Sequence, residues 1–350
     1  MKTVLTRTLT LIACSVSLAF GIPGSEAVAQ GSQSNATEQG ISSDVAKLAK
    51  QEGSVTWYSV FDPDQMAKLV QDFQSKHDIK INIIRSTGGS LIQRYSSELN
   101  AGKVTADIFS ISNPLYYHDE TEKGTFKKFT DKDLPNLKNW PKDAVLGDST
   151  VLLSINPFVI AYNTELIKPG DAPKTWADLL SPSLRGKIGS PNFAVAPTYV
   201  QFLNMWKNTL GSEFLKKFKD QKKRYFDSSV PGNQALAAGE LAVFAPTMPV
   251  FAQPLIKKGA PVKFVFVPGT TGNPIYAAVS TKAPHPNAAM LFMNYLLSGK
   301  AQQMINEGVA ATLLPGVDGS LKLPEKYQAP NPIQARDRAN DLLSEVGLTN

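Results

Sequence analysis

Cysteine is almost absent from this sequence, because Cys14 is the only one in 350 residues. An intrachain disulfide is therefore excluded, and with it the small secreted scaffolds that depend on such bonds. Glycine and proline, at 24 residues each, are too few for a fibrous or low-complexity chain. With 42% hydrophobic residues the chain can bury large cores, and its length favours about two domains.

Histidine is scarce too, and familiar catalytic motifs are missing. His77, His118 and His285 have no metal-ligand spacing, and His77 and His285 occupy positions typical of surface residues. The sequence contains no G-x-S-x-G elbow, phosphate-binding loop or H-E-x-x-H pair. We therefore expect no enzyme, no cofactor and no metal site. The alternative from another class is a secreted hydrolase whose catalytic groups meet only in the fold.

Strong charge of one sign is also lacking, since the formal net charge is only +6. The one dense basic run, KKFKDQKKR, covers residues 216–224. Phe214, Leu215 and Phe218 have the spacing of an inward helix face, so the run is interpreted as a solvated helix face. No aromatic platform accompanies it, and we expect no nucleic-acid partner.

The N-terminus has the pattern of a secretory signal peptide. Lys2 and Arg7 precede an uncharged, mostly apolar stretch over residues 8–21, and Ala27-Val28-Ala29 offers a cleavage site. The apolar stretch is shorter than the roughly 20 residues that a membrane-spanning helix needs. No later segment is long enough to span a membrane either.

We therefore expect residues 1–29 to be cleaved, residues 30–50 to form a flexible leader, and the mature protein to be periplasmic or secreted. Lipid attachment at Cys14 is the less favoured alternative, because only six residues separate it from Arg7.

Strand and helix patterns alternate in the first half of the mature chain, which predicts a parallel sheet with helices on its faces. The predicted elements are a strand over Val55–Ser59, a helix face at Met66, Leu69, Val70 and Phe73, a strand through Ile79, Ile81 and Ile83, a helix with Ile92, Tyr95 and Leu99 that Ser90 and Gln93 begin as a capping box, and a strand over Ala106–Ile111.

The same alternation restarts in the second half. Its predicted elements are an extended segment over Val151–Tyr162, a turn of helix capped by Thr175, short strands at Lys187–Gly189 and Leu241–Ala245, a helix with Tyr199, Phe202, Leu203 and Trp206, a helix over Gln234–Ala238 ended by Gly239, and a strand over Ile275–Ser280 before a helix with Ala288, Leu291, Phe292, Tyr295 and Leu296.

Two such modules joined by extended segments predict an α/β fold of two lobes with a ligand cleft between them. We assign residues 51–157 to the first lobe and residues 158–267 to the second. Residues 268–350 return to the first lobe and end in helices that can pack on either lobe.

Four stretches carry a resemblance to a known family, in their order and spacing along residues 52–315. They are Val55–Ser59 followed by Gly102–Phe109, Ile160–Thr164 followed by Lys174–Leu179 and Arg185–Ile188, Gly232–Glu240, and Pro286–Ala289 followed by Tyr295–Ser298. In these stretches the chain resembles the extracellular solute-binding proteins of bacterial ABC importers, and most closely the ferric-iron-type branch.

The resemblance implies a periplasmic-binding-protein-like fold of type II, with two mixed sheets flanked by helices and hinged by extended crossover strands. It also implies a monomer that encloses a small-molecule ligand without chemistry. The partners would be a membrane permease and its ATPase.

The chain departs from the ferric-iron-type branch in the loop that would bind the metal. Ferric-binding members hold iron with adjacent tyrosines in the loop that here reads Pro246-Thr247-Met248-Pro249, which contains no phenol. Tyr116-Tyr117 belongs to the other lobe. A ferric-iron-binding protein is therefore kept as the alternative to our main hypothesis.

The ligand site is expected beyond the carboxyl ends of the strands, near helix N-termini. Residues 87–90 open a helix with two glycines, which suits an anion or is simply a tight turn with a serine cap. Arg85 and Arg94 can add charge, although solvated positions are the interpretation for both. The candidate residues, rich in hydroxyls and amides, are Tyr58, Ser59, Thr87, Gly88, Gly89, Ser90, Ser112, Asn113, Asn192, Thr198, Ser229, Thr247, Asn273 and Tyr276.

Few carboxylates fall in these loops, and the nearest are Asp62, Asp64 and Asp227. The set therefore favours an anionic ligand, such as a phosphate, phosphonate or carboxylate compound.

Overall fold

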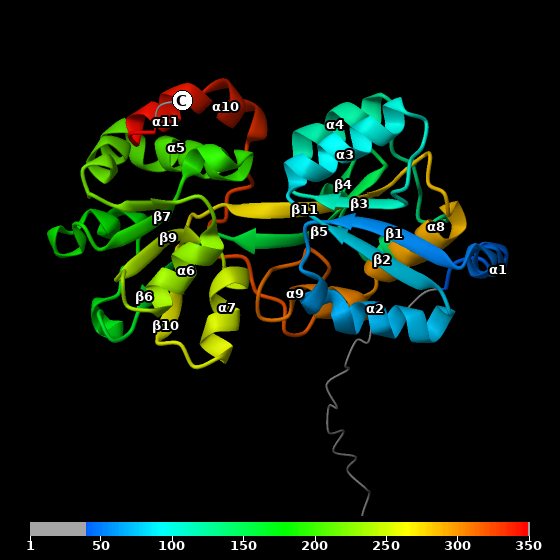
Figure 1. The fold of residues 1–350 in the computed structure, drawn as a ribbon, viewed down its shortest axis with the longest axis horizontal. Coiled ribbons are helices and arrows are strands. Elements are labelled where there is room, and N and C mark those ends of the chain that lie inside the picture. The colour runs from blue at the N-terminus through cyan, green and yellow to red at the C-terminus, as the bar shows by residue number, and fades with distance from the viewer. Residues whose placement is uncertain (1–39, 349–350) are drawn as a thin grey trace, which may run out of the picture. The chain divides into compact units, whose positions relative to one another are not determined.

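Two mixed sheets organise the computed structural model, which describes residues 40–348 apart from the side chains of Asp64 and Gln65 (Figure 1). The first sheet has the strand order β2–β1–β3–β11–β5–β4, and the second has the order β10–β6–β9–β7–β8. In the first sheet β1 is parallel to β2 and β3, whereas β11 is antiparallel to β3 and β5. The predicted two-lobed α/β fold is confirmed. The strands are β1 (Ser54–Ser59), β2 (Lys80–Arg85), β3 (Ile108–Ile111), β4 (Val145–Leu146), β5 (Thr150–Pro157), β6 (Val159–Asn163), β7 (Ile188–Pro191), β8 (Arg224–Phe226), β9 (Val243–Thr247), β10 (Val262–Phe266) and β11 (Gly272–Val279).

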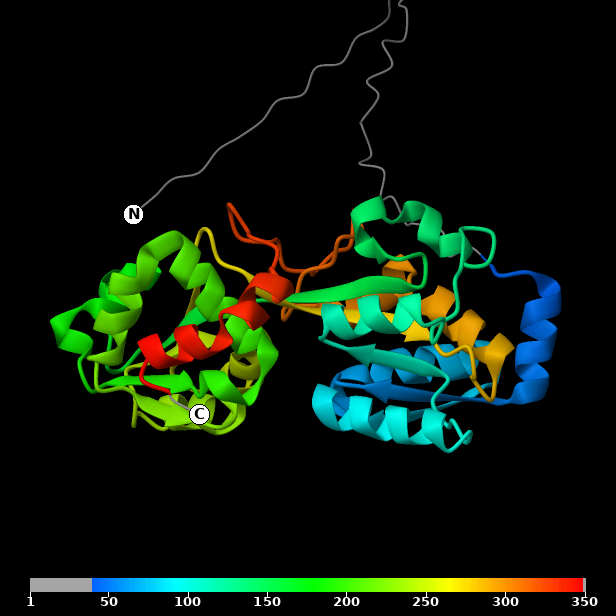
Figure 2. The ribbon, with the colours of Figure 1, turned by 90° about the horizontal axis from the view of Figure 1, so that it is seen from above.

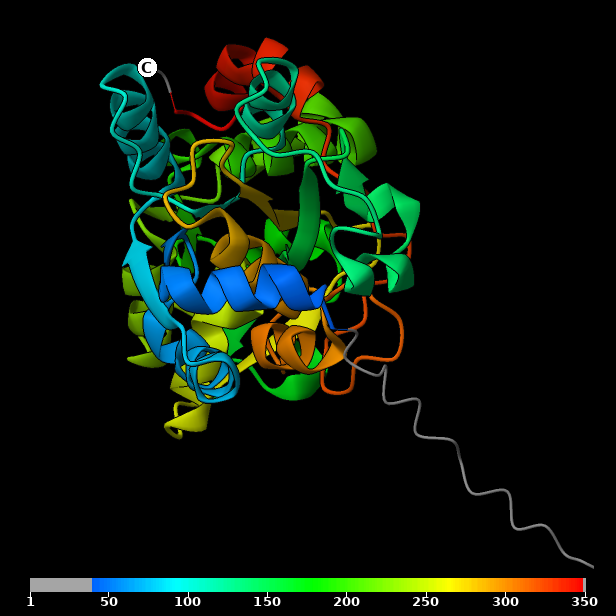
Figure 3. The ribbon, with the colours of Figure 1, turned by 90° about the vertical axis from the view of Figure 1, so that its right-hand side faces the viewer.

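Helices cover both faces of each sheet, and α1 packs against α8 at the end of the molecule that faces the viewer in Figure 3. Those of the first lobe are α1 (Ser43–Glu52), α2 (Pro63–His77), α3 (Gly88–Asn100), α4 (Pro114–Glu122), α8 (Pro286–Leu296) and α9 (Gly299–Asn306). Those that pack with the second sheet are α5 (Pro197–Lys219), α6 (Ser229–Ala237), α7 (Pro249–Lys257), α10 (Pro332–Asp337) and α11 (Ala339–Glu345). No helix in this described part of the chain has the length and apolarity to cross a membrane.

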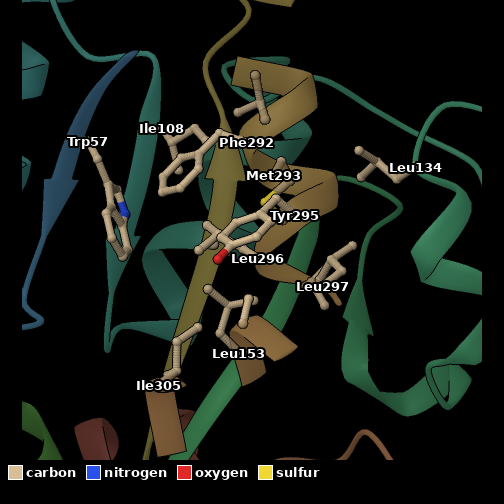
Figure 4. Close-up of a cluster of buried hydrophobic side chains, with 14 of the residues drawn as sticks. Trp57, Ile108, Leu134, Leu153, Phe292, Met293, Tyr295, Leu296, Leu297 and Ile305 are labelled. Carbon is tan, nitrogen blue, oxygen red and sulfur yellow. The ribbon is translucent and has the colours of Figure 1, made fainter. Parts of the chain in front are cut away.

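Side chains on both faces of β1 are buried, which is why the first sheet needs helices on both faces. Trp57 is fully buried in a core with Phe292 of α8, at 5.3 Å between ring centroids (Figure 4). The next residue, Tyr58, is fully buried in the separate core on the opposite face, against Phe109. Successive strand residues point to opposite faces, so one strand serves two cores.

The predicted extended segment over 151–162 is two strands, one in each sheet. β5 ends at Pro157 and β6 begins at Val159, so Phe158 alone connects the lobes there. The chain returns through residues 267–271 to β11, and residues 324–331 run beside that return. The helices α10 and α11 then pack on α5, as Figure 2 shows.

Cap chemistry corrects two predicted helix starts. The helix expected from Gln234 begins at Ser229 instead, because the Ser228 hydroxyl accepts from the Val230 amide. Proline within the first turn costs no helical hydrogen bond, so the earlier start is tolerated. At the other end Gly239 has φ +78° and closes the helix as predicted.

The capping box predicted for Ser90 and Gln93 is wrong as well. The cap of α3 is Thr87, whose hydroxyl accepts from the Ser90 amide at 3.3 Å. The helix therefore begins at Gly88, and both glycines belong to its first turn. The capping box of Thr175 and Asp178 does form, around a short 3₁₀ helix.

The basic run is only partly the predicted helix face. Phe214, Leu215 and Phe218 are buried, as predicted, but α5 ends at Lys219 and the run continues into β8. The ammonium of Lys223 donates to the Phe218 carbonyl at 3.0 Å and so caps the end of α5.

Asp72 of α2 is expected to make the protein less stable at acid pH than at neutral pH. Burial alone would raise the pKa of Asp72, but hydrogen bonds from Lys300, Tyr295 and Lys76 outweigh burial and lower it to about 2. A depressed folded-state pKa contributes stability above the unfolded value, and that stability is lost as the pH falls from about 4 to 2. Asp72→Asn should therefore cost about 1–2 kcal/mol at pH 7, because solvent screens the exposed lysines.

Urea unfolding at pH 7 and near pH 2 checks this expectation, since the cost should vanish at the lower pH. The matched control is Asp78→Asn, because Asp78 is 85% exposed and pairs with Lys50 at 3.5 Å. A control variant that loses as much as Asp72→Asn would contradict the assignment.

Candidate functional site

A cavity of about 550 Å³ lies between elements of the two sheets. Its first wall comes from the ends of β1 and β2, from α9 and from the segment after α9; its second wall comes from α6 and α7. Its floor is formed by β5 and β11, the two strands that lead across to the second lobe. Such a space between hinged lobes is the usual place for a small ligand.

The floor of the cavity is polar. Ser154 and Asn156 lie two residues apart on β5, so both side chains point to the same face. The register places Asn273 of β11 directly opposite Asn156. Ser154 is 1% exposed, and its hydroxyl has no partner among the described residues. These groups offer hydrogen bonds to whatever occupies the cavity.

Two cations line the rim of the same cavity. Arg85 ends β2 and Lys258 directly follows α7, and both side chains are exposed. Neither has an ion-pair partner among the side chains that the structure describes. Asp62, the carboxylate of the lining, already interacts within the chain. An anionic group is thus favoured at this rim.

The remaining walls are mostly apolar, and Gln234 of α6 is the polar side chain in them. On the α7 side they consist of Met248, Val250, Phe251, Pro254 and Leu255. Val60, Phe61, Ile305 and Val309 lie on the opposite side. A polar floor, two rim cations and apolar walls suit a ligand that joins an acidic group to a hydrocarbon body.

Of the candidate residues from the sequence, Asn273 lines this cavity. Ser112 does not line it, but its hydroxyl donates to Oδ1 of Asn273 and so orients that carboxamide. These two candidates come together at the site, and the others have the local roles described below.

Tyr58, Ser59 and Tyr276 lie outside the lining. Burial and the hydrogen bond to Glu98 raise the pKa of Tyr58, whose hydroxyl donates to that carboxylate in the core. The Ser59 hydroxyl accepts from the Phe61 amide at 3.0 Å. Tyr276 is half-buried against Tyr117, and burial raises its pKa.

Helix caps account for several further candidates. Besides Thr87, Asn113 caps α4 by accepting from the Tyr116 amide at 3.1 Å. Asn113 also lines a second cavity, of about 570 Å³, between α4 and α5. Asn192 accepts from the Ala194 amide at 3.1 Å and starts a 3₁₀ turn. Short polar side chains suit helix caps as well as ligand sites, and in this structure these residues form caps.

Buried contacts account for the other candidates of the second lobe. Ser229 shares a hydrogen bond of 2.7 Å with the Tyr199 hydroxyl. Thr247 is fully buried and accepts from the Asn233 carboxamide at 2.9 Å. The Thr198 hydroxyl is buried without a partner among the described residues, but it does not line the cavity.

The sequence interpretation missed Ser154, Asn156, Gln234 and Lys258. It looked for ligand groups in the loops after strands, whereas Ser154 and Asn156 lie within a strand. The available signal was the alternation of β5, which puts polar residues on one face of an otherwise apolar strand.

Gly88 and Gly89 are expected to be dispensable for folding. Neither has a positive φ; a Cβ on Gly88 would meet Ile111 at 3.8 Å, and one on Gly89 would meet nothing within 4 Å. Alanine at either position should leave stability unchanged or raise it by up to about 1 kcal/mol. Chemical denaturation measures this, and a loss above 1 kcal/mol would contradict it. Gly232→Ala is the contrasting variant, because its Cβ would lie 2.2 Å from Phe244.

The hydroxyl of Tyr117 is occupied by hydrogen bonds to the backbone. The single Tyr117 hydroxyl proton is shared between the Phe109 and Tyr276 carbonyls, and the hydroxyl oxygen accepts from the Ile111 amide. Burial raises the pKa of Tyr117 well above its usual value, which disfavours the phenolate that Fe³⁺ needs. No cluster of three or more His, Cys, Asp or Glu within residues 40–348 is placed to hold a metal.

Ser54, His285 and Asp107 form an array that resembles a catalytic triad. Ser54 Oγ lies 3.3 Å from His285 Nε2, and His285 Nδ1 lies 2.9 Å from the buried Asp107 carboxylate. Ser54 does not line the interlobe cavity, and Glu52 occupies the amides at the start of α8 that would have stabilised an oxyanion. The array therefore connects β1, β3 and α8. His285 was expected to be a surface residue, but its ring contacts both Ser54 and Asp107.

Comparison with known proteins agrees with this architecture. The sequence model of a family described as bacterial extracellular solute-binding protein matches residues 68–334. The substrate-binding protein of an ABC transporter from Agrobacterium tumefaciens has a TM-score of 0.72 at 15% identity, over 84% of this chain and 94% of its own. Iron-bound HitA from Pseudomonas aeruginosa has a TM-score of 0.69 at 20% identity, over 84% and 99%.

AfuA from Actinobacillus pleuropneumoniae, with fructose-6-phosphate bound, has a TM-score of 0.63 at 18% identity, over 85% and 99% of the two chains. At these identities the similar structures report the fold and not the ligand. The family match covers most of the chain. This chain belongs to the family of bacterial extracellular solute-binding proteins, the solute-binding components of ABC transporters.

Proposed function

We propose that the protein captures an anionic organic solute in the interlobe cavity and delivers it to a membrane permease driven by an ATPase. The observation that carries this proposal is the pair of rim cations, Arg85 and Lys258, which have no ion-pair partner among the described residues. The polar floor supplies hydrogen bonds to the same ligand, and the apolar walls favour an organic body. The protein binds its solute as a monomer and performs no chemistry on it.

The proposed function also requires that the protein is exported from the cytoplasm. Residues 1–29 form a cleaved signal peptide, and the mature protein works in the periplasm. Residues 1–29 lie outside the part of the chain that the structure describes. Residues 158–267 form one lobe, while residues 43–157 and the first part of 268–350 form the other. The flexible leader expected over residues 30–50 is wrong for residues 43–50, because they belong to α1, which packs on α8.

Ferric iron is the alternative ligand, and HitA is a structural neighbour that binds it. The loop 246–249 has no phenol to offer iron, and the hydroxyl of Tyr117 is occupied. AfuA, by contrast, binds a sugar phosphate, which is an organic anion. These observations support the anion over the metal.

Native mass spectrometry of protein isolated from its own periplasm, with iron measured on the same sample, tests the proposal. We expect an organic anion to co-purify and iron to be far below one atom per chain. One iron per chain, or a bound cation without any response to organic anions in calorimetry, would overturn it. X-ray scattering should also show compaction when the anion is added.

A further inference from the structure

The two rim cations of the cavity come from different lobes. Arg85 is the last residue of β2 in the first sheet, and Lys258 follows α7, which packs on the second sheet. Asp62 is the carboxylate beside them, but it is already engaged within the chain, whereas the cations have no ionic partner among the described residues. Each lobe thus brings one positive charge to the cavity, and a ligand with two acidic groups would compensate both.

The floor between the lobes favours acceptor oxygens. The Ser112 hydroxyl donates to Oδ1 of Asn273, which leaves Nδ2 of Asn273 as the atom that can donate to a ligand. Asn156 lies directly opposite, is only 5% exposed and lines the cavity. Its carboxamide can donate a hydrogen bond to an acceptor oxygen of a bound ligand.

The apolar wall excludes a small inorganic ion as the natural occupant. Phe251, Pro254 and Leu255 on α7 offer hydrocarbon surface to the same space. Phosphate or sulfate alone would leave that surface in water, whereas an organic body would cover it.

We infer that the ligand is an organic dianion, with two acidic groups at the ends of an apolar body. Arg85 and the Asn156–Asn273 pair hold one acidic group, and Lys258 holds the other. The ligand then joins the two lobes by its own charges, so that closure depends on both ends. This inference rests on the proposed function and names its substrate class.

Calorimetry on the purified protein with linear dicarboxylates of four to eight carbons, each matched by the monocarboxylate of equal length, tests this inference. We expect one dicarboxylate to bind at least about tenfold more tightly than its monocarboxylate. Lys258→Gln should abolish that preference, so that the dicarboxylate binds no more tightly than its monocarboxylate. Arg85→Gln should weaken both ligands by about tenfold or more.

Lys257→Gln is the matched control, because Lys257 is the exposed neighbour of Lys258 and does not line the cavity. It should bind like the wild type, and thermal denaturation should show that all three variants are folded. Equal affinity for mono- and dicarboxylates, or a Lys258→Gln variant that keeps the preference, would overturn the inference and leave the proposed function intact. If no organic anion binds the folded protein, the proposed function fails as well.

Discussion

Asp107→Ala is expected to lower the free energy of unfolding by about 4 kcal/mol. Asp107 is fully buried just before β3, and its carboxylate accepts from the Thr56 and His285 amides, each at 2.7 Å. The same carboxylate binds the His285 ring at 2.9 Å. Alanine would leave two amides and an imidazole without their acceptor, at a carboxylate that is itself fully buried.

Equilibrium unfolding in guanidinium chloride measures this loss. The chain contains a matched control in Asp119→Ala, because Asp119 faces His118 at 3.5 Å but is 65% exposed. An exposed pair of this kind should contribute less than about 0.5 kcal/mol. If the two alanine variants were equally stable, the proposed role of the Asp107 array in holding β1, β3 and α8 together would be wrong.

Trp206→Ala is expected to cost about 4 kcal/mol, in the core of the second lobe. Trp206 is fully buried in α5, with ring centroids 4.6 Å from Phe202, 4.9 Å from Phe218 and 5.0 Å from Phe214. Removing the indole leaves a cavity that these rigid rings cannot close. The Asp107 and Trp206 variants thus probe the two lobes separately.

Trp206→Phe is the control for the second lobe. The indole nitrogen is buried without a hydrogen-bond partner among the described residues, so phenylalanine loses volume but no hydrogen bond. We expect it to cost less than about 2 kcal/mol in thermal or chemical unfolding. A loss as large as that of Trp206→Ala would mean that the indole nitrogen has a partner, such as water, that matters.

Much of the fold was predictable because local periodicity records burial. Phe73 in α2 and Trp206 in α5 lie on the helix faces that their spacing predicted, and Gly239 ends α6 as predicted. The start of α6 was less predictable because Ser228 competes with later residues as a cap. Helix starts depend on which of several suitable side chains meets a free amide.

The candidate site was predictable only in part. Thr87, Asn113 and Asn192 were expected at the ligand, but in this structure they cap helices and do not line the cavity of Arg85 and Lys258. Asn113 instead lines a second cavity, of about 570 Å³, between α4 and α5. Hydroxyl and amide side chains serve caps and ligands equally well, so their chemistry alone does not separate the two roles. Asn156, by contrast, lies in the middle of a strand, where no ligand residue was sought.

By itself the sequence determined the class of the fold and its lack of disulfide support, since strand and helix periods and a missing cysteine are properties of neighbouring residues and of composition. Tertiary structure alone decided what lines the site. Asn156 and Asn273 are far apart in the chain and meet only through the register of β5 and β11. Arg85 and Lys258 share a cavity only because two sheets bring their ends together. Pairings of this kind are long-range, and no local pattern encodes them.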